Sequence, residues 1–179
     1  MTAADIVILS VTGLSVLFDL CVRRIPNWLI LFGLGSGLIL NLYRGLDQFA
    51  YSLLGFVVGI VIFVIPFSLG WIGAGDVKYF GVVGALLGVQ WLPRVLFYSA
   101  IVAGVIAVGY VVTGRHKLRF FSGTWADLKI AILTFGRILP APKNIEASNG
   151  SRSVPWGVAF GLGTIFAYYF DPSGSLAGF

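Results

Sequence analysis

Two acidic residues stand where apolar surroundings make a charge unfavourable. Asp19 ends the first apolar run of the chain, and Asp76 lies in a glycine-rich segment, residues 70–78, between two further apolar runs. Ionisable residues at membrane depth are rare and usually mark function. Two carboxylates a few ångströms apart share one proton near neutral pH, so one can take a proton from water while the other donates to a scissile peptide bond. Because such a pair titrates as a unit, the sequence assigns neither role.

The remaining residues exclude several other chemistries. The chain has one Cys and one His, His116, so it cannot form a disulfide framework or a zinc site of several Cys and His. A dinucleotide site needs a third glycine after Gly73 and Gly75, and a P-loop needs Lys where Asp76 stands. We therefore expect no metal and no cofactor.

The composition is that of an integral membrane protein. Of 179 residues, 58% are hydrophobic and 11% are charged, whereas soluble domains devote about 25% to charged residues. A spanning helix needs about 20 mainly apolar residues. We predict a single all-α domain over residues 1–179, a polytopic bundle of about six transmembrane helices, and no cleaved signal peptide. The predicted spans are residues 4–20, 28–43, 49–69, 77–92, 95–113 and 154–170.

The distribution of Lys and Arg predicts the orientation. If the turn with Arg23 and Arg24 is cytoplasmic, alternation places ten basic residues on that side and only Arg44 and Arg94 on the other. Both termini are then non-cytoplasmic, and Asp19 and Asp76 lie at one depth on the cytoplasmic face. The net charge of +5, with no soluble basic domain, favours anionic lipid over nucleic acid as a partner. The simpler alternative is that Asp19 pairs with Arg23, and Asp76 with Lys78.

The only long polar stretch is a predicted cytoplasmic loop, residues 114–153. Within it, residues 125–139 carry apolar side chains at helical spacing together with charges. This pattern fits an amphipathic helix in the headgroup region, and it fits equally an ordinary surface helix packed on the bundle. Because the loop is basic, we expect it to bind anionic lipid and to repel a basic peptide.

Glycines are expected to serve two purposes. Around Asp76, we expect Gly73 and Gly75 to accept positive φ and to let an extended peptide backbone approach. Elsewhere, small residues four apart let membrane helices pack closely. The pairs with that spacing are Gly33/Gly37, Gly55/Gly59, Gly84/Gly88 and Gly157/Gly161.

Three segments, in order, resemble a known family. Residues 73–78 (GAGDVK) are similar to the GxGDxK motif of type IV prepilin peptidases, polytopic aspartyl proteases of the bacterial inner membrane. Residues 19–27 (DLCVRRIPN) resemble that family's other acidic motif, in which an aspartate shortly precedes R-x-I-P-N. Residues 154–161 (VPWGVAFG) are similar to its P-[YF]-G-x-A segment. The resemblance covers nearly the whole chain.

The resemblance implies that Asp19 and Asp76 are the catalytic aspartates. It also implies that the substrate is a pilin-like precursor, cut at the cytoplasmic face between its basic leader and its apolar helix. The supporting motif residues are Gly73, Gly75, Lys78, Arg23, Pro26, Asn27, Pro155 and Gly157. The chain lacks the cytoplasmic region that bifunctional members carry between the first two spans, and so resembles the compact peptidases of tight-adherence (Flp-type) pilus systems. N-methyltransferase activity is therefore not expected.

Two other functions are weighed against this one. A presenilin-like or signal-peptide-peptidase-like protease would place its aspartates deeper, whereas Arg23 and Arg24 hold Asp19 near the interface. A small transporter could use Asp19 and Asp76 as a proton or cation relay. That relay needs polar residues continuing through the bundle, and the second, third, fifth and sixth spans offer few.

Overall fold

The computed structural model describes residues 3–22, 24–69, 71–112 and 156–173, and this part of the chain is helical with short turns. Each of the six apolar runs identified in the sequence contains an α-helix in its described part, and α4 ends at Leu87, before the end of the fourth run. The elements are α1 (Ala3–Val22), α2 (Asn27–Arg44), α3 (Leu46–Ser68), α4 (Ala74–Leu87), a 3₁₀ turn η1 (Val89–Trp91), α5 (Leu92–Val112) and α7 (Trp156–Phe170). The all-α prediction is confirmed for the described residues.

Among the described residues, three helices are long and apolar enough to cross a membrane. They are Ala4–Val22, Leu46–Ser68 and Val89–Gly109, and Trp156–Phe170 is a shorter apolar helix. The chain is therefore a helical membrane protein, and the count of six spans stays a prediction. The predicted loop at 114–153 and the predicted helix at 125–139 lie outside the described residues.

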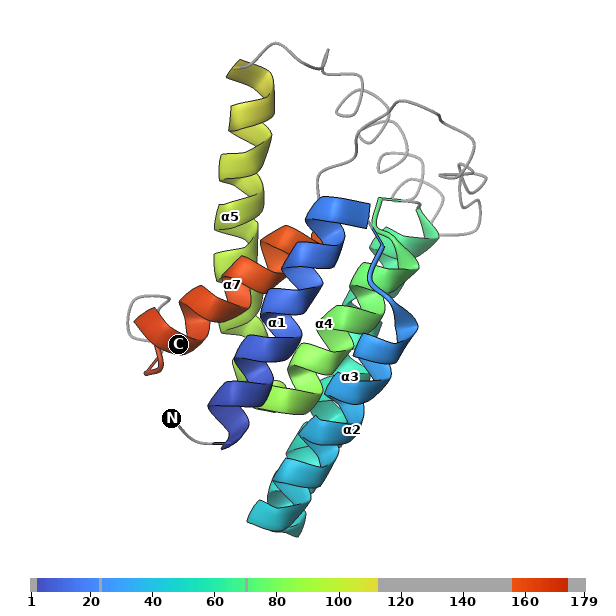
Figure 1. Ribbon diagram of the computed structural model, residues 1–179, viewed down its shortest axis with the longest axis vertical. Helices are drawn as coiled ribbons and strands as arrows, with labels where there is room; N and C mark the ends of the chain where they lie inside the picture. The colour runs from blue at the N-terminus through green and yellow to red at the C-terminus, as the bar shows by residue number, and fades with distance from the viewer. Residues whose placement is uncertain (1–2, 23, 70, 113–155, 174–179) are drawn as a thin grey trace, which may run out of the picture.

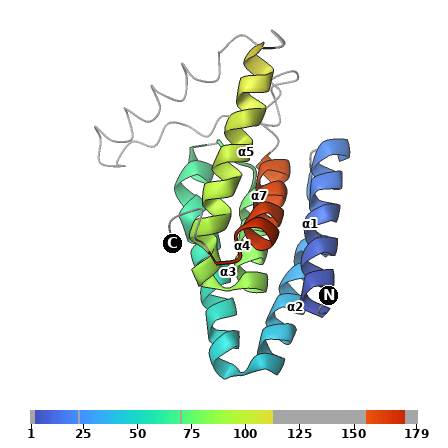
Figure 2. The ribbon, with the colours of Figure 1, turned by 90° about the vertical axis from the view of Figure 1, so that its left-hand side faces the viewer.

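Helix α4 is the centre of the bundle, since it contacts α1, α2, α3, α5 and α7. Figure 1 shows that the end of α1, the start of α4 and the start of α7 lie at the same end of the bundle. The start of α1 and the end of α7 lie toward the opposite end, and Figure 2 shows the same arrangement from the side. The two acidic motifs are thus carried by neighbouring helix ends.

Close glycine contacts hold α4 against α2 and α3. A Cβ added to Gly55 in α3 would lie 2.2 Å from the Gly84 carbonyl oxygen of α4, and one added to Gly37 in α2 would lie 3.1 Å from the Ala85 backbone. These contacts confirm that the spaced glycines are packing positions. Gly88 is the exception, because it ends α4 with φ 89° and a Cβ there would meet nothing closer than 3.8 Å.

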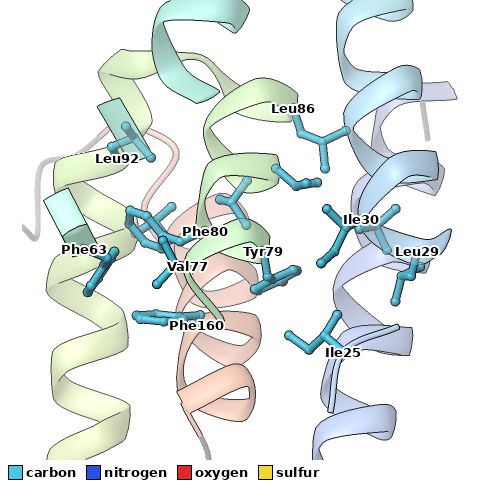
Figure 3. Close-up of a cluster of buried hydrophobic side chains, with 14 of the residues drawn as sticks. Ile25, Leu29, Ile30, Phe63, Val77, Tyr79, Phe80, Leu86, Leu92 and Phe160 are labelled. Atoms are coloured by element: carbon cyan, nitrogen blue, oxygen red, sulfur yellow. The ribbon is translucent and has the colours of Figure 1, made fainter. Parts of the chain in front are cut away.

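The interior of the bundle joins α3, α4 and α7 through three aromatic rings. Phe63, Phe80 and Phe160 are all buried, and their ring centroids lie 4.8 to 5.1 Å apart. Figure 3 shows the three labelled rings close to one another. Tilted and edge-to-face arrangements of this kind add about 0.5–1.5 kcal/mol per pair beyond area burial.

Polar side chains from α2 and α3 bind the last carbonyl groups of α4. The last carbonyls of a helix have no partner within it. The Asn41 side-chain amide of α2 donates to the Ala85 and Leu86 carbonyls at 3.0 and 3.3 Å, and the Ser52 hydroxyl of α3 donates to the Ala85 carbonyl. Asn41 and Ser52 are buried, so these bonds fix α4 in register with its neighbours.

Candidate active site

Asp19 is a buried acid held by the first turn of α7. Its side chain is 6% exposed, in the last turns of α1. The Val158 amide donates a hydrogen bond of 2.9 Å to Asp19 Oδ2. Val158 is the third residue of α7, where backbone amides have no acceptor within their own helix. The carboxylate therefore serves as a cap for a helix far away in the sequence.

Gly157 makes that contact sterically feasible. A Cβ at this position would lie 2.8 Å from Asp19 Cγ and 2.9 Å from Asp19 Cβ and Oδ2. The sequence had identified Gly157 as a motif residue and as a packing glycine. The structure shows that what it packs against is the acidic side chain itself.

Asp76 lies in the first turn of α4 and is partly buried. Gly73 precedes this helix as its N-cap residue. The Asp76 amide donates to the Gly73 carbonyl at 3.1 Å, and the Gly73 amide donates to the Asp76 carboxylate. This is the acidic half of a capping box, and a carboxylate also complements the positive end of the helix dipole.

The structure brings the two acids together. Helices α1 and α4 are in contact, and the Asp19 and Asp76 carboxyl groups are close enough to repel each other when both are charged. Each carboxyl group also accepts a backbone amide at a helix N-terminus. A nearby negative charge favours the protonated form of a carboxyl group, so the arrangement favours one protonated and one ionised acid.

The glycine turn differs from the sequence-based expectation. Gly73 is extended with φ −75° and ψ 151°, and Gly75 lies within α4, so neither needs the positive φ that we had expected. A Cβ on Gly75 would lie 3.8 Å from the Ile25 backbone nitrogen, which is an ordinary contact. Ile25, the residue that lies against Gly75, belongs to the R-x-I-P-N segment of the other acidic motif. In that segment Pro26 is the N-cap of α2, and its carbonyl accepts the Leu29 amide at 3.1 Å.

Trp156 ties α7 to the glycine turn. Its indole Nε1–H donates a 3.2 Å hydrogen bond to the Trp71 carbonyl oxygen, two residues before Gly73. The third motif of the sequence contains Trp156, but its residue type did not predict this partner. The role of the Val158 amide was not predicted, because nearly every residue type carries a backbone amide and the sequence does not show which one binds a side chain.

Two of the remaining candidate residues lie at the surface. Lys78 and Asn27 are exposed, and Arg23 and Pro155 lie outside the described residues. The alternative pairing of Asp19 with Arg23 therefore stays a prediction. In the described part of the chain, no group of three His, Cys, Asp or Glu is placed to hold a metal ion.

A cluster of buried hydroxyl groups joins α1, α4 and α7. The Tyr79 hydroxyl lies beside those of Thr12, Ser15 and Thr164, and all four residues are at most 1% exposed. The two threonine hydroxyls donate to carbonyls of their own helices, Ile8 and Phe160. Although the groups are neighbours, the Tyr79 and Ser15 oxygens are in no hydrogen bond of good geometry. Sequence patterns did not reveal this cluster, since isolated hydroxyl residues in apolar helices are common.

Comparison with known proteins agrees with the two acidic motifs, whereas the third motif, residues 154–161, lies outside the residues that match the family model. Residues 6–108 match the model of the type IV leader peptidase family. Over 116 residues the chain is 30% identical to a prepilin leader peptidase/N-methyltransferase of Bacillus subtilis (strain 168), covering 64% of this chain and 47% of the relative. It is 34% identical over 109 residues to the protein of the same description from Burkholderia pseudomallei (strain 1026b), covering 57% and 35%. The chain thus spans half or less of the length of these relatives. No solved structure matches it.

Proposed function

Since this chain belongs to the type IV leader peptidase family, we propose that it is a membrane-embedded aspartyl endopeptidase that removes the basic leader from pilin-like precursors. The observation that supports the proposal most is that Asp19 and Asp76 lie near each other, at the ends of helices that are in contact. The family and the apolar helices indicate a protein of the bacterial inner membrane. The charge distribution favours a cytoplasmic active site and non-cytoplasmic termini.

In the proposed reaction, the pair shares one proton between its two carboxyl groups. The ionised carboxyl takes a proton from water as the water oxygen attacks the scissile carbonyl, and the protonated one donates to the leaving nitrogen. The C–N bond breaks, giving a new carboxyl group on the leader and a new amine on the pilin-like chain. The amides of Val158 and Gly73 orient the two carboxyl groups. Methyl transfer is not part of the proposal.

The substrate is proposed from chemistry at the membrane surface. A precursor with a basic leader before an apolar helix would lie with its helix among the spans and its leader at the interface. The bond to be cut would then reach the start of α4. Anionic lipids are the second proposed partner, through the basic residues of the cytoplasmic side.

The test is a cleavage assay with purified protein in liposomes. The substrate is a synthetic peptide with a basic leader joined to an apolar helix, and mass spectrometry identifies the fragments. We expect one cut at the junction. The matched control peptide has the same apolar helix without the leader.

The alternatives give different results in the same preparation. Cleavage of the control peptide within its apolar helix would favour a presenilin-like protease. Proton or cation flux across the liposome membrane, with no peptide cut, would favour a relay. Either result would contradict the proposed function.

A further inference from the structure

The first turn of α7, residues Trp156, Gly157 and Val158, touches both halves of the proposed active site. The Val158 amide binds the Asp19 carboxylate at 2.9 Å. The Trp156 indole binds the Trp71 carbonyl at 3.2 Å, in the turn that leads to Asp76. One turn of one helix therefore reaches the acid on α1 and the segment that begins α4.

This turn is itself firmly placed. The Trp156 ring stacks near Phe160 at a centroid distance of 5.9 Å, and Phe160 packs on Phe63 and Phe80 in the interior. Further along α7, a Cβ on Gly163 would lie 2.6 Å from the Ser99 backbone, so α7 and α5 are in close contact there. Because these contacts anchor α7 independently of Asp19, the helix can serve as a fixed reference for the acid.

We infer that this turn of α7 is the positioning element of the active site, and we call it the clamp. It sets where the Asp19 carboxylate stands relative to the turn that carries Asp76. The backbone amide fixes the carboxylate oxygen, Gly157 leaves the space for it, and the indole fixes the Trp71 carbonyl. The inference rests on the proposed function, and it adds the residues that set the geometry of the pair.

A clamp of this kind acts on the rate more than on substrate binding. Misplacing a catalytic group by about 1 Å lowers the rate by about 100-fold. All three contacts join groups of the protein to one another, so none of them is a contact with the substrate. We therefore expect clamp variants to lower kcat and leave KM within about twofold.

Three substitutions test the clamp with intact protein in liposomes. Trp156→Phe keeps an aromatic ring, although a smaller one, and removes the indole donor, and Trp91→Phe is the same change at the far end of the bundle. Gly157→Ala drives a methyl group into Asp19, and Gly13→Ala is its control, because a Cβ there meets nothing within 4 Å. Val158→Pro removes the amide, and proline is tolerated in a first helical turn. Val158→Ala measures what the side chain alone contributes.

We expect Trp156→Phe, Gly157→Ala and Val158→Pro each to lower kcat by about 10- to 100-fold. The inference is overturned if all three keep kcat within about twofold of their controls. A second readout is independent of catalysis, namely the thermal midpoint Tm in detergent of Asp19→Ala, Val158→Pro and the double variant. If the Val158 amide binds Asp19, the Tm loss of the double variant should be smaller than the sum of the two single losses by about 2–4 °C.

Additive Tm losses would overturn the clamp even if cleavage fell. Wild-type protein that cuts no precursor would instead refute the proposed function, and the Tm cycle would still decide whether the contact exists. The two failures are therefore distinguishable.

Discussion

Gly84 lies directly against the backbone of Gly55 in α3, and replacing it with alanine should impair catalysis from a distance. Gly84 lies about 12 Å along α4 from Asp76, at 1.5 Å per residue. A Cβ there would lie 2.1 Å from the Gly55 carbonyl oxygen, whereas ordinary contact begins at 3.4 Å. The difference requires α3 and α4 to separate by about 1.3 Å. The atoms of Gly55 that the added Cβ would meet are all backbone atoms, so no side chain can rotate away to make room.

Two consequences follow from that separation. Overpacking costs about 1–3 kcal/mol, and the better helix propensity of alanine returns up to about 1 kcal/mol. We expect a net loss near the upper end, about 2 kcal/mol, which lowers Tm by about 4–8 °C in a chain of this size. A shift of α4 by about 1 Å also moves Asp76 against Asp19, which lowers kcat by about 100-fold.

The assay compares Gly84→Ala with Gly104→Ala in the same liposomes. Gly104 in α5 has nothing within 4 Å of an added Cβ, so it reports the effect of alanine itself. Leader cleavage gives kcat, and thermal unfolding in detergent gives Tm. The reasoning is refuted if Gly84→Ala matches Gly104→Ala in both. A lower Tm with undiminished kcat would show that α4 packing does not control the acidic pair.

Three further predictions concern single side chains. Asn41→Ala removes the amide donor from the buried Leu86 carbonyl and leaves the Ala85 carbonyl with the Ser52 hydroxyl alone. Thermal unfolding should therefore show a loss of about 1–3 kcal/mol, and an unchanged Tm would contradict the capping role. Tyr79→Phe removes a buried hydroxyl that lacks a well-formed hydrogen bond, so Tm should stay within about 2 °C or rise, and a large drop would show that the hydroxyl cluster is a real network. Gly75→Ala should retain leader cleavage, because its Cβ would meet Ile25 at 3.8 Å, whereas loss of cleavage would support our original idea that bare backbone is needed there.

Much of the fold was predictable because apolar runs of this length permit little besides helices. Every predicted run contains a helix, and the glycine spacing identified Gly55 and Gly84 as packing positions, though not as partners of each other. Alternation of the helices predicted that both acids fall at the same end of the bundle, although it did not predict that α1 and α4 would be in contact. These inferences depend only on residue type and period, which the sequence displays directly.

The rest depends on backbone atoms and on which helices become neighbours. The Val158 amide looks like any other in the sequence, and only the placement of α7 against α1 gives it a role. Our expectation for Gly73 was wrong in its conformation, because we assumed a loop where α4 already begins at Ala74. The capping arrangement of Gly73 and Asp76 follows from that helix start, so an earlier helix boundary in the prediction would have identified it.

The central claim is that Asp19 and Asp76 act together, and single asparagine substitutions test it most directly. Asn keeps the size of the side chain and can still accept a hydrogen bond, but it cannot take or release the proton in question. Leader cleavage in liposomes should fall to background in both Asp19→Asn and Asp76→Asn, with Tm close to that of the unmodified protein. Cleavage that persists in either variant would contradict the claim.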